Sequence, residues 1–132
     1  MTPPVTSTTA LSRSSILRGL QVAAVLTLVS LAFHYVTAGQ LFPRGGPEEL
    51  HAGGAIVLHV LSGLTAVAAV LLVRRGGAPT WPAALAVLLF VLTFVQAATG
   101  GRDTLWIHVP GAMVLTVGAR WLTAWAFTAG RR

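Results

Sequence analysis

The sequence contains no cysteine among its 132 residues, and only 9% of the residues are charged. The absence of thiols excludes disulfides, zinc–thiolate sites, iron–sulfur clusters and covalent c-type haem attachment. Soluble domains carry roughly 25% charged residues, whereas 55% of this chain is hydrophobic. The composition therefore favours a chain immersed in lipid.

Acidic residues are scarce as well, since three of them stand against nine basic residues, all of which are arginine. The net charge of +6 raises the question of a nucleic-acid partner. The arginines lie at the ends of the apolar runs and form no single patch or stripe, so we expect no nucleic-acid binding. The sequence also has no nucleophile–base pair, phosphate-cradling loop or acidic metal cluster, and it assigns no enzyme activity.

Four long apolar runs predict an all-α fold, a membrane four-helix bundle in which successive helices run up, down, up and down. The runs cover about residues 20–38, 50–73, 81–99 and 105–128. The flanking stretches are predicted to be tails, and residues 1–17 are rich in Thr, Ser and Pro, which is typical of disorder. The predicted domain organisation is therefore a tail at 1–17, a bundle at 18–128 and a short tail at 129–132.

The first run has an alternative interpretation as a signal peptide, because Val36-Thr37-Ala38 resembles a cleavage site. Its length of about 19 residues favours a retained membrane span. The matching run later in the chain is also expected to be a span. We therefore expect four spans.

The arginines also predict the orientation of the chain across the membrane. Six of them lie before the first run, at residues 74–75 and at the C-terminus. The loops after the first and third runs hold only Arg44 and Arg102, together with all three acidic residues. We therefore expect a multi-pass protein of a bacterial plasma membrane, surrounded by lipid, with both termini in the cytoplasm.

A short repeat opens the second and fourth runs. Residues 51–55 and 108–112 both read His-x-x-Gly-Ala, and a weaker match joins residues 33–39 to 94–100. Two hairpins that run the same way imply a pseudo-twofold axis along the membrane normal. The second and fourth helices are then diagonal, so the two histidines should face each other near the outer end of the bundle.

Two opposed imidazoles are the ligand set of a six-coordinate haem iron, and helical bundles build cofactor sites from facing helices. We therefore expect His51 and His108 to be the metal ligands of a b-type haem. Arg44 and Arg102 in the outer loops would pair with its propionates. Small residues one turn after each histidine would line the faces of the macrocycle. These are Gly54, Ala55, Gly111 and Ala112.

Four further polar residues lie near this site or deeper in the bundle. Glu48 is expected to orient an imidazole by accepting a hydrogen bond. His34 is an alternative ligand, a group that supports the ligands, or a packing residue, and packing is favoured. Gln96 on the third run is expected to hydrogen-bond inward. His59 lies about 12 Å deeper than His51 and is expected to form an interhelical hydrogen bond, with a cofactor or proton role as the alternative.

The motifs Glu48-x-x-His51 and Gln96-x-x-x-Gly100, followed by His108, resemble one four-helix half of haem A synthase. In that family, histidines on the second and fourth helices of each half flank a haem, and a Glu precedes the first histidine. The resemblance covers about residues 20–127. It implies the haem-bundle architecture and not the oxidase chemistry, because haem A synthase has two halves and the Arg usual after its first histidine is Ala52 here.

The chain is also similar to small four-span bacterial membrane proteins of unknown function, which carry the same two histidines. Three functions stay open at this point. The first is a haem protein of electron transfer or haem handling, as a homodimer or with respiratory or haem-pathway membrane proteins. The second is a cofactor-free accessory or assembly protein, whose histidines and glycines serve helix packing. The third is a small proton-linked transporter that uses His59.

Overall fold

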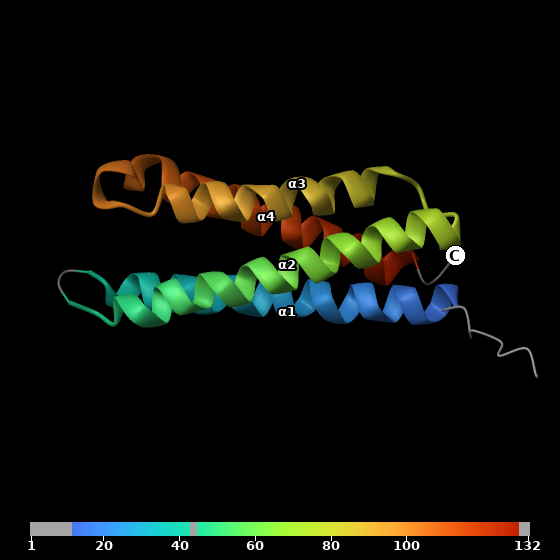
Figure 1. Ribbon diagram of the computed structural model, residues 1–132, viewed down its shortest axis with the longest axis horizontal. Helices are drawn as coiled ribbons and strands as arrows, with labels where there is room; N and C mark the ends of the chain where they lie inside the picture. Colours follow the sequence, from blue (N-terminus) through green and yellow to red (C-terminus); the bar gives the residue numbers. More distant parts are fainter. Residues whose placement is uncertain (1–11, 43–44, 130–132) are drawn as a thin grey trace, which may run out of the picture.

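The computed structural model describes residues 12–42 and 45–129, and within these ranges the chain is helical and contains no strand. Most of both predicted tails lies outside them. The predicted all-α fold with four long helices is confirmed for the described residues (Figure 1). These are α1 (Arg13–Gln40), α2 (Glu48–Gly76), α3 (Trp81–Ala98) and α4 (Leu105–Ala129), with a short 3-10 helix η1 (Arg102–Thr104) before α4.

The first helix begins earlier than the sequence predicted. It starts at Arg13, so the last part of the predicted tail 1–17 is helical. Ser12 caps the helix, because its side chain accepts a hydrogen bond from the backbone N–H of Ser15. Ile16 in the first turn is buried in the core. The predicted boundary was wrong because apolar side chains ahead of the long run also pack inside.

The four helices pack in a ring. Helix α1 contacts α2 and α4, and α3 contacts the same two helices. Helices α2 and α4 are therefore diagonal, with no close backbone contact between them in the described part of the chain. The connection from α1 to α2 and the connection from α3 to α4 lie at the same end of the ring (Figure 1). We call this the histidine end, and the opposite end, which holds Arg13, Arg18, Arg74 and Arg75, the arginine end.

Apolar packing is concentrated toward the arginine end. The larger core cluster there includes Leu20, Leu72 and Leu122, which are almost completely buried. A second cluster around Leu31 and Leu58 occupies the middle of the bundle. The cavity beside it measures about 20 Å³, which is room for about one water molecule. The centre of the bundle is therefore closed, and larger spaces lie at its ends.

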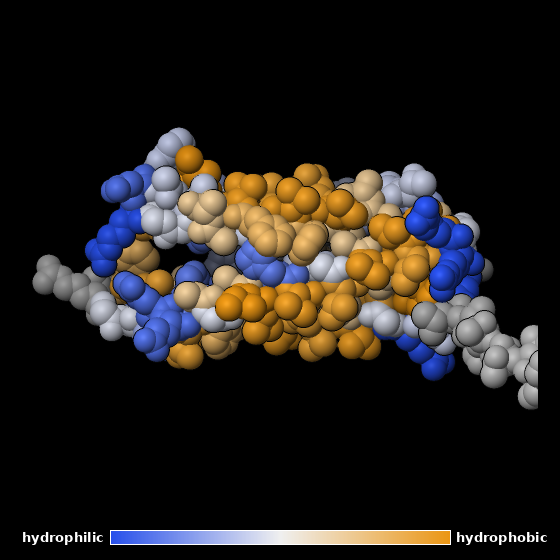
Figure 2. All heavy atoms as spheres, in the orientation of Figure 1, coloured by the Kyte–Doolittle hydropathy of each residue, from blue (hydrophilic) through white to orange (hydrophobic). Residues whose placement is uncertain are grey.

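Three of the helices, α1, α2 and α3, are long and apolar enough to cross a membrane, which indicates a membrane protein. Large apolar side chains are exposed along the helices, and Figure 2 shows them as a band between two hydrophilic ends. Helix α4 has nearly the bounds predicted for the fourth span, but it is not among these three. His108 and Arg120 within it lower its hydropathy, and its crossing of a membrane stays a prediction.

Candidate functional site

The site is built around the two histidines of the repeat. His51 is the fourth residue of α2 and His108 the fourth residue of α4, so the two helices place them at the same level. Their rings reach across the diagonal, with centroids 6.4 Å apart and planes inclined by 62°. The expectation that these two side chains meet at one end of the bundle is thereby confirmed. Their role as ligands stays a prediction.

A third imidazole joins this pair from α1. The ring centroid of His34 lies 5.0 Å from that of His51, with the rings inclined by 66°. Its Nδ1–H donates to the backbone carbonyl of Ser30 at 2.9 Å. Its Nε2 is buried and has no hydrogen-bond partner among the described residues. The structure thus places His34 beside the pair, where the sequence offered either a ligand or a packing residue.

Each histidine of the pair is held through its Nδ1. His108 Nδ1–H donates to the backbone carbonyl of Gln96 at 3.0 Å. His51 Nδ1 lies 2.9 Å from the hydroxyl oxygen of Thr37. That hydroxyl donates to the backbone carbonyls at the end of α1, so it accepts from His51. In its neutral form each ring then carries its proton on Nδ1 and its lone pair on Nε2, which is the form that binds a metal.

Thr37 is the functional residue that the sequence interpretation missed. Glu48, the acceptor expected for His51, lies exposed in the first turn of α2, where a carboxylate stabilises the helix dipole. The expected acceptor was therefore wrong. One signal pointed to Thr37, because it follows His34 by three residues and so shares its helix face.

The glycines of the repeat lie against side chains of the neighbouring helices. A Cβ at Gly54 would lie 3.0 Å from both His34 Cε1 and Phe33 Cε1. A Cβ at Gly111 would overlap the side-chain amide of Gln96. The amide oxygen of Gln96 is itself buried without a hydrogen-bond partner among the described residues. The glycines thus let α1 and α3 bring polar side chains up to the histidine helices.

The remaining predicted site residues are less central. Ala55 and Ala112 are half-buried, and their backbone carbonyls accept hydrogen bonds from side chains one turn later in the same helices. Arg102 is exposed in η1. Arg44 lies outside the described residues. The pairing of the two arginines with a cofactor stays a prediction.

His59 is separate from the cluster. Its Nδ1–H donates to the carbonyl of Ala55 within α2, and its ring packs edge-on against Phe94 of α3 with centroids 4.2 Å apart. The expected interhelical hydrogen bond is therefore replaced by a bond inside the helix and an aromatic contact. His59 therefore satisfies its donor within α2, and its ring contact on α3 is the apolar ring of Phe94.

The side chains around the histidine cluster limit the kinds of ligand that it could bind. No group of three or more His, Cys, Asp or Glu side chains is placed to hold a metal ion by itself, in the part of the chain that the structure describes. Figure 2 shows an opening between the two halves of the bundle at the histidine end. Two imidazoles alone suit a cofactor that brings further ligands of its own.

Comparison with known proteins gives no family: no family model, curated protein or solved structure matches the chain. The function is therefore argued from the geometry of the histidine end.

Proposed function

We propose that the chain is an integral membrane protein with four spans, which binds one b-type haem between His51 and His108. Its placement in a bilayer is supported by the three helices of spanning length and composition. It is also supported by the exposed apolar band of Figure 2, because a surface of that kind is costly in water.

Helix α4 is the fourth span in this proposal. Its 25 residues exceed the roughly 20 that a hydrocarbon core of about 30 Å requires, and it packs against two helices of spanning character. Arg120 is exposed on this helix, and its long stem can carry the charge to the membrane interface. The arginine end would face the cytoplasm and the histidine end the outside.

The bundle is proposed to run up, down, up and down, with a pseudo-twofold axis that relates α1 and α2 to α3 and α4. Matching contacts support this symmetry. In one hairpin His34 lies against Gly54. In the other, Gln96 lies against Gly111. Each contact joins a polar side chain near the end of one helix to the repeat glycine of the next.

A second pair of contacts indicates which residue of α3 corresponds to each residue of α1 under this symmetry. The hydroxyls of Thr37 and Thr99 each donate to the carbonyls three and four residues earlier. The match of residues 33–39 with 94–100 pairs Thr37 with Ala98 instead. The contacts therefore favour a register one residue away from the one read in the sequence.

The distance between the two rings is the observation that carries the haem proposal. With metal–imidazole bonds of about 2.0–2.1 Å, two imidazoles on opposite sides of one metal have centroids about 6 Å apart. The centroids of His51 and His108 are 6.4 Å apart. Two protein ligands are sufficient for haem, because the macrocycle supplies the other four.

The polar groups around the rings also fit this ligand. The Nδ1 bonds to Thr37 and Gln96 fix the tautomers and orient the rings, and such partners raise the basicity of a ligating imidazole. The buried acceptors of His34 and Gln96 lack partners among the described residues. Buried polar atoms of this kind usually have a bound molecule or an ordered water as partner.

Haem bound in this way supplies reversible one-electron transfer. His51 and His108 would both hold the iron, so the proposal includes no binding of oxygen or another substrate to it. The proposal is therefore an electron-transfer or haem-handling role. It transfers no oxidase chemistry from haem A synthase.

The test is the absorbance spectrum of the full chain, purified in detergent and supplied with haemin. We expect the sharp Soret and α bands of a six-coordinate, low-spin haem, and loss of these bands in His51→Ala and in His108→Ala. His59→Ala is the matched control, because this histidine lies on α2 outside the cluster and should leave the spectrum unchanged. A wild-type protein that stays colourless, or bands that survive both cluster substitutions, would overturn the proposal.

A second function is favoured by the glycine contacts, which have a sufficient explanation in packing alone. Besides the two repeat glycines, Gly63 lies against Phe90, and Gly118 lies against Leu89, whose Cδ2 would be 2.7 Å from an added Cβ. Small residues commonly bring membrane helices together. In this case the chain is a cofactor-free accessory protein, and the double variant of His51 and His108 remains folded while no form of the protein binds haem.

A further inference from the structure

The arginine end of the bundle contains a cavity that is larger than the one in its middle. Its volume is about 380 Å³, within the range of roughly 300–1,000 Å³ that small-molecule sites occupy. Its walls come from the starts of α1 and α3, the ends of α2 and α4 and the connection between α2 and α3. The lining residues are Arg13, Leu72, Ala78, Pro79, Trp81, Trp125, Thr128 and Ala129.

Arg13 is fixed at this cavity by α2. Its Nε–H donates to the backbone carbonyl of Gly76 at 3.1 Å. Its stem lies on the same residue, because a Cβ at Gly76 would lie 3.2 Å from Arg13 Cγ. The two terminal nitrogens of the guanidinium make no hydrogen bond to the residues that the structure describes. They are therefore available as a planar pair of donors, which is the geometry that phosphate prefers.

The charge at this end has one sign. Every charged side chain that the structure describes here is an arginine, and the three acidic residues of the whole chain, Glu48, Glu49 and Asp103, belong to α2's first turn and η1 at the other end. Neither α1 nor α3 has an acidic residue in its first turn. The partial positive charges of these two helix starts are offset by the negative ends of α2 and α4, so the net positive charge at the cavity comes from Arg13. A ligand of this cavity should be an anion.

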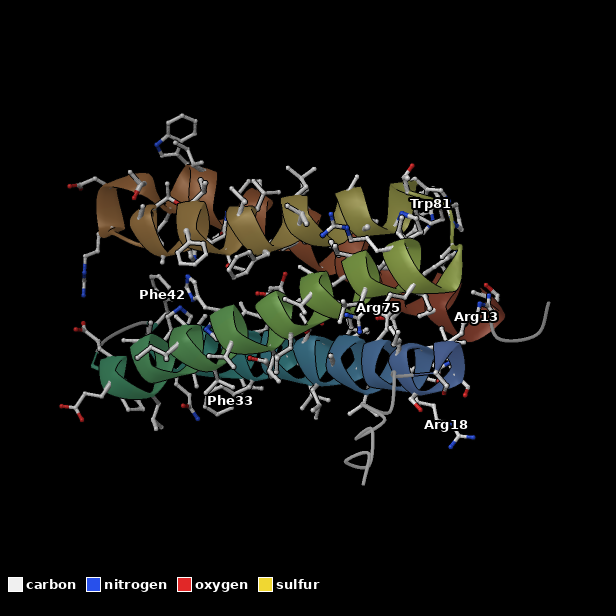
Figure 3. All side chains as sticks on the ribbon, turned by 45° about the vertical axis from the view of Figure 1, so that its right-hand side comes forward. Arg13, Arg18, Phe33, Phe42, Arg75 and Trp81 are labelled. Atoms are coloured by element: carbon white, nitrogen blue, oxygen red, sulfur yellow. The ribbon has the colours of Figure 1, made fainter. Side chains whose placement is uncertain are left out.

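The rest of the lining is aromatic and apolar. The rings of Trp81 and Trp125 pack edge to face with centroids 5.5 Å apart. Figure 3 shows Trp81 and Arg13 at the same end of the bundle, whereas Arg18 points away from it. Indole rings favour the headgroup level of a bilayer. A free phosphate ion would use the arginine alone, while a phospholipid would also contact the indoles with its glycerol and first acyl carbons.

We propose that this cavity binds the headgroup of an anionic glycerophospholipid, with the lipid phosphate on the Arg13 guanidinium and the glycerol region against the two indoles. The proposal rests on the bilayer placement described under Proposed function, but not on haem. Basic pockets between helices at the cytoplasmic surface are known to favour anionic lipids.

The experiment is native mass spectrometry of the full chain in detergent, titrated with phosphatidylglycerol or with phosphatidylcholine of the same acyl chains. We expect one preferred phosphatidylglycerol per chain and an affinity about fivefold lower in Arg13→Gln. Arg18→Gln is the matched control, because this arginine is five residues later on α1 and does not line the cavity. It should leave the affinity unchanged.

A further variant and a competition experiment are added to the test. Thr128→Glu adds an acidic group to the exposed rim without touching Arg13, so it should weaken phosphatidylglycerol binding even if Arg13→Gln fails to fold. Inorganic phosphate should not compete at concentrations comparable with the lipid. Equal binding of the two lipids, equal losses in Arg13→Gln and Arg18→Gln, or displacement by inorganic phosphate would overturn the proposal. The haem bands should be the same in all these variants, so failure at one end is distinguishable from failure at the other.

Discussion

The two ends of the bundle differ in the side chains that fill their interiors. At the arginine end, leucines and alanines from all four helices fill the interior, and Leu20 and Ala126 have no exposed surface. At the histidine end, three imidazoles, a threonine hydroxyl and an amide take that place, and two of their polar atoms lack partners among the described residues. The apolar end is held together by packing of its side chains, whereas the polar end leaves buried polar atoms without partners among the described residues.

The difference in packing between the two ends indicates which end stabilises the fold and which end is suited to bind a ligand. Buried polar groups without partners cost about 1–3 kcal/mol each, so the histidine end contributes little to holding the fold. A chain can accept that cost when the other end is tightly packed. We therefore expect substitutions in the apolar core at the arginine end to change stability, and substitutions at the histidine end to change haem binding.

The largest effect should come from Leu20→Ala. Truncating a fully buried leucine removes packing contacts and leaves a cavity, which costs about 2–5 kcal/mol. The measurement is reversible unfolding in detergent, followed by circular dichroism. Haem affinity, measured at a temperature where the variant is fully folded, should be close to that of the wild type.

The matched control for this variant is Leu64→Ala, because Leu64 is 54% exposed on the apolar surface of α2. It removes the same atoms from the lipid-facing side and should change the stability little. If Leu20→Ala weakened haem binding more than it weakened the fold, the two ends would not be separate in the way proposed here.

The second effect concerns the histidine end alone. Thr37→Val removes the oxygen that holds His51 Nδ1 and keeps the shape of the side chain. Loss of such a partner typically lowers metal-site affinity by about 10- to 100-fold. Haem affinity from a spectroscopic titration should fall by this amount, while the unfolding midpoint should move little.

Thr99→Val is the control for this prediction, since the Thr99 hydroxyl makes the same pair of backbone bonds in α3 but contacts no imidazole. Equal losses of haem affinity in the two variants would show that the effect comes from the helix ends and not from the orientation of His51.

Much of the fold was predictable, because long apolar runs and the proline- and glycine-rich breaks between them determine helix number and approximate bounds. The meeting of His51 and His108 was predictable too, since the repeat gives both the same position in diagonal helices. The start of α1 was not, because Ser12 and Ile16 lie ahead of the recognisable run. A local cap and the buried side chains of Ile16 and Leu17 moved the boundary.

The partners of the histidines were harder to predict from the sequence. Glu48 was chosen for its chemistry and its distance along the chain, but the bundle turns a hydroxyl of α1 toward His51 and leaves the carboxylate at the surface. The partner of His108 is a backbone carbonyl, which carries no side-chain signal at all. Which residue lies across a helix interface depends on rotation about the helix axes, and the apolar pattern around these helices is too uniform to fix that rotation.

The smallest expected effect lies between the two ends. The buried hydroxyls of Thr27 on α1 and Thr65 on α2 are 3.1 Å apart, and hydrogen bonds between membrane helices contribute about 0.6 kcal/mol on average. Thr27→Val should lower the free energy of unfolding by about this amount, and a double-mutant cycle with Thr65→Val should assign it to the pair.

Thr123→Val is the control, because this equally buried hydroxyl bonds only within α4. Haem and lipid binding should both be unchanged in Thr27→Val. A change in either would mean that the middle of the bundle couples its ends, and that stability and ligand binding cannot be separated along its length.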